Sequence, residues 1–100
     1  MEQTKTISNN LTRYKTKEPE QYNVIMHNDD YTTMDFVIKV LVDIFKKQRD
    51  EAERLMMKIH KEGKAVVGRY LFDIACSKAK YAMTLARQNG FPLKLTVEKE

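Results

Sequence analysis

The spacing of apolar residues alternates between two periods along residues 21–99, and this alternation limits the possible folds most strongly. Tyr22, Val24 and Met26 recur at every second position, which is typical of a strand, and later segments repeat their apolar residues at helical spacing. The pattern predicts strands near 21–27, 65–70 and 93–98, and helices near 32–45, 50–62 and 71–89. The order β-α-α-β-α-β indicates a two-layer α/β (α+β) sandwich, with a three-stranded sheet covered on one face by three helices.

Residues that favour helix ends mark most of these boundaries. Thr32 is a suitable N-cap for the first helix, with Asp35 three residues later as in a capping box. Asp50 can cap the second helix, while Gly63 and Gly90 can end the second and third helices. The faces that we expect to be buried carry Met34, Val37, Ile38, Leu41, Ile44 and Phe45, then Ala52, Leu55, Met56 and Ile59, then Ala75, Ala79, Ala82 and Ala86.

A chain of 100 residues has room for one domain. Residues 1–20 are polar and show no period, so we interpret them as a flexible N-terminal arm that precedes a domain over residues 21–100. The sequence has no signal-peptide pattern and no apolar run near the ~18–20 residues that span a bilayer. The single cysteine, Cys76, cannot form an intramolecular disulfide. We therefore expect a soluble cytoplasmic protein that is not bound to a membrane.

The net charge of +4 first suggests a polyanionic partner, and a basic nucleic-acid-binding module is one alternative function. The basic residues are nevertheless scattered among acids, as on a solvated helix face, and no basic stripe with interleaved aromatic residues appears. Residues 21–45 hold one basic and four acidic residues, a net charge of −3. The charge pattern therefore favours a function without nucleic acid and draws attention to the acidic stretch.

An acidic turn, Asn28-Asp29-Asp30, follows the first strand, and it has three interpretations. It can be a tight turn beside a helix cap, a site for a hard metal cation, or a site for an organic cation such as an amine. The spacing of an EF-hand is absent. A metal-dependent hydrolase that uses Asp29, Asp30 and His60 stays open as a second alternative, although no zinc-ligand spacing appears. Cys76 lies among alanines and does not resemble an activated nucleophile, so enzyme chemistry has little support.

Three segments together resemble the ClpS family, the adaptors of the bacterial Clp protease. They are HNDDYTTMDFV at 27–37, LMMKIHKEGKA at 55–65 and FPLKLTVEK at 91–99. The resemblance extends over about residues 21–100, with the segments in the same order and at matching spacing. It implies an adaptor with no catalytic residues, no metal and no cofactor, which we expect to be a monomer.

The resemblance also implies a ligand and a site. ClpS proteins bind N-degron peptides and proteins whose first residue is Leu, Phe, Tyr or Trp. Carried over to this sequence, Asn28 and His60 would hydrogen-bond the α-amino group, with Asp29 and Asp30 as further acceptors, and Thr32 would hold the substrate backbone. The side-chain pocket would be lined by Met26, Met34, Val37, Met56, Ile59 and Leu93, with Met34 as the gatekeeper against β-branched first residues.

The same resemblance implies delivery of the bound substrate to a AAA+ unfoldase of the ClpA or ClpC type. Asp73, Ser77 and Lys78, near the start of the third helix, would dock on the N-domain of the unfoldase, and the arm over residues 1–20 would enter it. The sequence departs from the family pattern at Thr33, where many members have proline, and at Ile59, where valine is common. Our hypothesis is that the additional methylene of Ile59 narrows the pocket and disfavours Trp.

Overall fold

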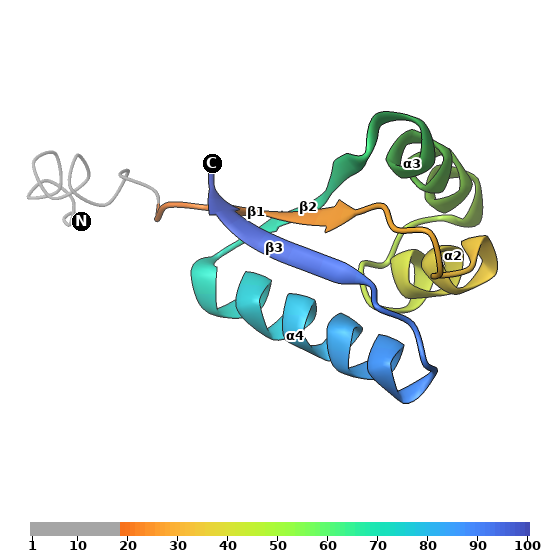
Figure 1. Cartoon of the computed structure of the whole chain (residues 1–100). Helices are drawn as coiled ribbons and strands as arrows, with labels where there is room; N and C mark the ends of the chain where they lie inside the picture. Colours follow the sequence, from red (N-terminus) through yellow and green to blue (C-terminus); the bar gives the residue numbers. More distant parts are fainter. Residues whose placement is uncertain (1–18) are drawn as a thin grey trace, which may run out of the picture.

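The computed structural model describes residues 19–100 and shows the expected order of elements (Figure 1). Residues 1–18 of the expected arm lie outside the described residues. The elements are β1 (Tyr22–His27), α2 (Met34–Asp43), α3 (Arg49–Glu62), β2 (Lys64–Tyr70), α4 (Phe72–Gln88) and β3 (Lys94–Lys99). The predicted fold class and element order are therefore confirmed.

The three strands form an antiparallel sheet in the order β2-β1-β3, with β1 in the centre. His27, at the end of β1, pairs with Lys64 of β2 and Lys94 of β3. The register between β1 and β2 shifts between Val24 and Ile25, where β2 carries one additional residue. Because His27 pairs with Lys64, the loop 28–33 that follows β1 starts beside the first residue of β2.

Helix α4 covers one face of this sheet and leaves the other face open, while α2 and α3 lie at one end of the strands (Figure 1). Helix α4 lies along the sheet and packs through a row of small residues, Ala75, Ala79, Ala82 and Ala86, all of which are buried. Helices α2 and α3 pack against each other beside α4, and α3 also contacts β2. Fully buried side chains from both layers meet in the core: Val24, Met26, Val40, Leu41, Val67 and Leu93.

The structure corrects two of the predicted helix caps. The N-cap of α2 is Thr33, not Thr32, because Thr33 has extended backbone angles and its hydroxyl accepts a hydrogen bond from the Phe36 amide at 3.2 Å. The N-cap of α3 is Gln48, and Asp50 lies within the first helical turn, where its charge still favours the helix dipole. Gly63 ends α3 in the left-handed conformation, with φ 94°, as predicted.

Candidate functional site

A cavity of about 410 Å³ opens between the loop 28–33, the start of α2 and the last turns of α3. Two parts of the chain that are distant in sequence, residues 28–37 and the second half of α3, therefore line one cavity. The lining residues are Asn28, Asp29, Asp30, Tyr31, Thr32, Thr33, Met34, Val37, Met56, Ile59 and His60.

A backbone hydrogen bond holds two of these parts together. The amide of Asn28 donates to the carbonyl oxygen of Gly63 at 2.8 Å, which fastens the end of β1 to the residue that ends α3. His60 precedes Gly63 by less than one helical turn, so the same bond keeps the end of α3 beside the loop. The side-chain amide of Asn28 and the imidazole of His60 thereby lie at one cavity.

Asp29 lines the cavity, but its carboxylate is engaged by the loop itself. Its carboxylate accepts hydrogen bonds from the Tyr31 amide at 2.8 Å, the Thr32 amide at 2.6 Å and the Thr32 hydroxyl at 2.7 Å. Burial alone would raise the pKa of Asp29, but the hydrogen bonds from Thr32 and Tyr31, together with the charge of Arg87, lower it below 3.8. Asp29 is thus held ionised by its own loop, and the Thr32 hydroxyl is already used as a donor.

Three other polar groups of the lining differ from Asp29, because Asn28, Asp30 and His60 are all exposed at the cavity. An amide oxygen, a carboxylate and an imidazole nitrogen can all accept a hydrogen bond. A cationic ligand with several N–H donors would match this set. The cavity mouth is therefore suited to a protonated amine.

Apolar side chains form the floor of the cavity. Val37, Met56 and Ile59 are buried and belong to the hydrophobic core, while Met34, the first residue of α2, is 47% exposed at the rim. Met26 and Leu93, which the resemblance assigns to the pocket, are completely buried in the same core cluster and do not line the cavity. The floor can accept an apolar group of limited size.

Two lining residues, Tyr31 and Thr33, are absent from the set expected from the sequence. Both lie inside the segment 27–37 that carries the family resemblance, so the motif could have drawn attention to them. Thr33 caps α2, and Tyr31 is 75% exposed at the rim.

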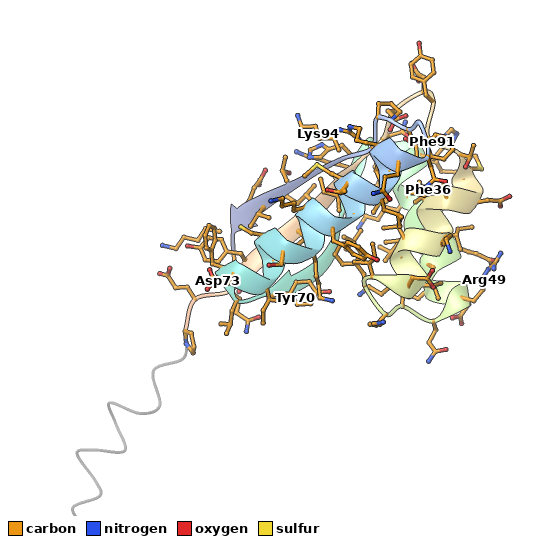
Figure 2. All side chains as sticks on the ribbon, turned by 90° about the horizontal axis from the view of Figure 1, so that it is seen from below. Phe36, Arg49, Tyr70, Asp73, Phe91 and Lys94 are labelled. Atoms are coloured by element: carbon orange, nitrogen blue, oxygen red, sulfur yellow. The ribbon has the colours of Figure 1, made fainter. Side chains whose placement is uncertain are left out.

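The residues expected to dock on an unfoldase lie on α4, away from the cavity. Figure 2 shows Asp73 and Tyr70 near the start of α4 and Phe91 beyond its other end. Asp73 and Ser77 are exposed, but the Lys78 ammonium donates to the Ile44 carbonyl oxygen at 2.9 Å and lies 5.3 Å from the centre of the Tyr70 ring. Lys78 therefore ties the end of α2 to α4 and β2.

The described residues offer no observation that supports either alternative function, the metal-dependent hydrolase or the nucleic-acid-binding module. Within residues 19–100 there is no group of three or more His, Cys, Asp or Glu residues that could hold a metal ion. In the same described part, five basic residues form ion pairs with carboxylates, which locally offset their positive charge: Lys39, Arg49, Arg54, Arg69 and Lys99. No helix of this described part is both long and apolar enough to cross a membrane.

Known proteins are similar to this chain in sequence and in fold. The model of the family described as ATP-dependent Clp protease adaptor protein ClpS matches residues 17–96. A Clp protease adapter protein ClpS from Treponema denticola is 55% identical over 82 residues, 82% of this chain and 81% of the relative. Another from Acetivibrio thermocellus is 45% identical over 96 residues, 96% of this chain and 97% of the relative.

A solved structure agrees with the sequence matches. It is Agrobacterium tumefaciens ClpS2 bound to L-phenylalaninamide, with a TM-score of 0.80 and 44% identity over 83% of this chain and all of the other. A two-layer α/β fold with a cavity that is polar at its mouth and apolar at its floor is typical of a small recognition domain. The chain belongs to the ClpS family, and it is an adaptor of Clp protease, not an enzyme.

Proposed function

We propose that the cavity binds the free amino terminus of N-degron substrates that begin with Leu, Phe, Tyr or Trp. One observation carries this proposal: exposed acceptors at the mouth and buried apolar side chains at the floor line the same cavity. The α-amino group would lie at Asn28, Asp30 and His60, and the first side chain would enter toward Val37, Met56 and Ile59. L-phenylalaninamide, the ligand of the Agrobacterium structure, has the same two features, a free amine and a bulky apolar side chain.

The energetics of such a complex are sufficient. Burial of a Leu or Phe side chain contributes roughly 1.5–3 kcal/mol, and each hydrogen bond to a charged group contributes about 1.5–3 kcal/mol. A filled pocket and two or three such bonds reach about 8 kcal/mol once the cost of ordering the ligand is counted, which corresponds to micromolar affinity. Acetylation removes the charge and two of the three donors, so an acetylated peptide should be rejected.

Asp29 and Thr32 have an indirect role in this proposal. Because the Asp29 carboxylate already accepts three hydrogen bonds, it would shape the loop and add negative potential instead of contacting the amine directly. The Thr32 oxygen keeps a lone pair with which it could still accept a substrate amide. Met34, exposed at the rim, would restrict branched side chains at the entrance.

The proposal includes delivery to a AAA+ unfoldase of the ClpA or ClpC type, in the cytoplasm and from an adaptor monomer. Exposed apolar residues neighbour Asp73 in the sequence at the start of α4, namely Leu71, Phe72 and Ile74. A mixed apolar and charged surface of this kind suits a protein partner. Lys78 would support that surface indirectly, because its hydrogen bond to the Ile44 carbonyl oxygen holds α4 against the end of α2.

A peptide series tests the proposed function directly. Fluorescence anisotropy would compare labelled peptides that differ only in their first residue, each with a free and with an acetylated amino terminus. We expect micromolar or tighter binding for free Phe and Leu peptides and no saturable binding for the acetylated ones. Equal binding of the free and acetylated forms would refute the proposed amine site.

A further inference from the structure

A second hollow, of about 520 Å³, adjoins the candidate cavity. It is lined by Tyr31, Arg87, Gly90, Phe91 and Pro92. Tyr31 lines both spaces, so the two spaces adjoin at this residue of the loop. The hollow is open and lies beside the turn that connects α4 to β3, where Figure 2 labels Phe91.

The lining of this hollow is apolar with one fixed cation. The Phe91 ring packs against Phe36, with ring centres 5.0 Å apart, which holds it in place. The Arg87 guanidinium donates from Nη1 to the carbonyl oxygens of Phe91 at 3.0 Å and Leu93 at 2.8 Å. Its Nε and Nη2 donors and its flat face are not used by these two bonds. Arg87 is therefore positioned by the turn and can stack on a planar group.

Tyr31 is placed to contact a ligand that leaves the first cavity. Its amide is held by the Asp29 carboxylate, while its side chain is 75% exposed. In an extended chain, successive side chains point to opposite sides, and neighbouring residues are about 3.3–3.6 Å apart. A peptide whose first side chain points into the cavity floor would direct its second side chain away from the floor, toward the rim that carries Tyr31.

We infer that the Tyr31–Arg87–Phe91 hollow is a subsite for an aromatic side chain at the second position of the bound substrate. The inference rests on the proposed function, because the first residue must occupy the adjoining cavity. An aromatic ring would lie against Tyr31 and the Arg87 guanidinium, over Phe91 and Pro92. Aromatic contacts of this kind strengthen binding by about 3- to 10-fold.

The test compares two unacetylated peptides, Phe-Ala and Phe-Trp at their first two positions, with otherwise identical sequences. We expect the wild-type protein to bind the Phe-Trp peptide about 3- to 10-fold more tightly. In Tyr31→Ala this ratio should fall to about 1, whatever the change in the affinity for the Phe-Ala peptide, because Tyr31 also lines the first cavity. Tyr31→Phe keeps the ring and should keep the ratio, and Tyr81→Ala removes a similarly exposed tyrosine on α4 as the matched control.

The outcomes separate this inference from the proposed function. A wild-type ratio near 1, or a ratio that persists in Tyr31→Ala, would overturn the subsite while binding of the Phe-Ala peptide upholds the amine site. If the wild-type protein binds neither peptide, the proposed function and the subsite are both refuted.

Discussion

The amide of Asn28 and the carbonyl oxygen of Gly63 are joined by a hydrogen bond of 2.8 Å, although 35 positions separate the two residues in the sequence. This bond connects the central strand to the end of α3, and both residues adjoin the candidate amine site. Because the bond uses only backbone atoms, substitution of the Asn28 or His60 side chain leaves it in place. The site can therefore be altered chemically without dismantling its frame.

Asn28→Ala and His60→Ala should each weaken binding of a Phe-initiated peptide by at least about 10-fold, since each removes an acceptor for a charged amine. Thermal unfolding should stay close to that of the wild type, because both side chains are exposed. Lys39→Ala, an exposed change on the outer side of α2, is the matched control and should bind normally. Anisotropy titration measures the affinities, and unchanged binding in both site variants would contradict the assignment.

The Ile59→Val variant should shift the binding preference toward peptides with a larger first residue. Ile59 is 3% exposed and lines the cavity floor, so loss of one methylene enlarges the space there. We expect the affinity for a Trp-initiated peptide to rise relative to that for a Leu-initiated peptide, at a stability cost of about 0.5–1.5 kcal/mol. Competition titrations measure the change in preference. If the wild-type protein already binds both peptides equally well, the narrowing attributed to Ile59 is wrong.

The lowered pKa of Asp29 predicts a pH-dependent contribution to stability. A carboxyl whose pKa is lower in the folded than in the unfolded chain stabilises the fold above its unfolded value, near 3.8, and the contribution is lost as the pH falls through the folded value. Asp29→Asn should therefore unfold more easily than the wild type near neutral pH, and the difference should shrink as the pH falls below 3.8. Urea denaturation at several pH values measures this, and a difference independent of pH would argue against it.

Substitutions of Lys78 and Asp73 should distinguish a residue that supports the docking surface from one that contacts the unfoldase directly. Lys78→Ala removes the bond to the Ile44 carbonyl, so we expect both lower stability, by roughly 1 kcal/mol or more, and weaker binding to an unfoldase N-domain. Asp73→Ala should weaken that binding with little change in stability, because its side chain is exposed. Calorimetry of binding and thermal unfolding give the two quantities. Normal unfoldase binding by Asp73→Ala would remove this residue from the docking surface.

The sequence predicted the elements well where their periodicity is produced by burial. The alanine row of α4 and the glycine at the end of α3 are local signals with one strong physical meaning, and both are confirmed. The cap of α2 was predicted one residue too early because two adjacent threonines can both serve. The structure distinguishes them, since Asp29 engages the hydroxyl of Thr32 and leaves Thr33 to cap the helix.

The cavity was predictable only in part. Asn28, Asp30 and His60 are marked by residue type and by the family motif, and the structure brings them to one place. Periodicity could not indicate that Met26 and Leu93 lie in the sealed core, because core and pocket residues have the same apolar pattern. Nor could it indicate that Tyr31 is exposed and lines two hollows, since that depends on how the fold places the loop relative to the distant turn after α4.

Val37, Met56 and Ile59 line the cavity and also belong to the hydrophobic core, so a change of specificity at the floor is also a change in folding stability. Each substitution at these positions that changes the ligand preference would therefore also lower the stability of the fold. Substitutions of the rim residues Met34 and Tyr31 should cost less stability, because these residues are 47% and 75% exposed. Diversification of this adaptor, by natural selection or in the laboratory, should therefore begin at the rim and reach the floor last.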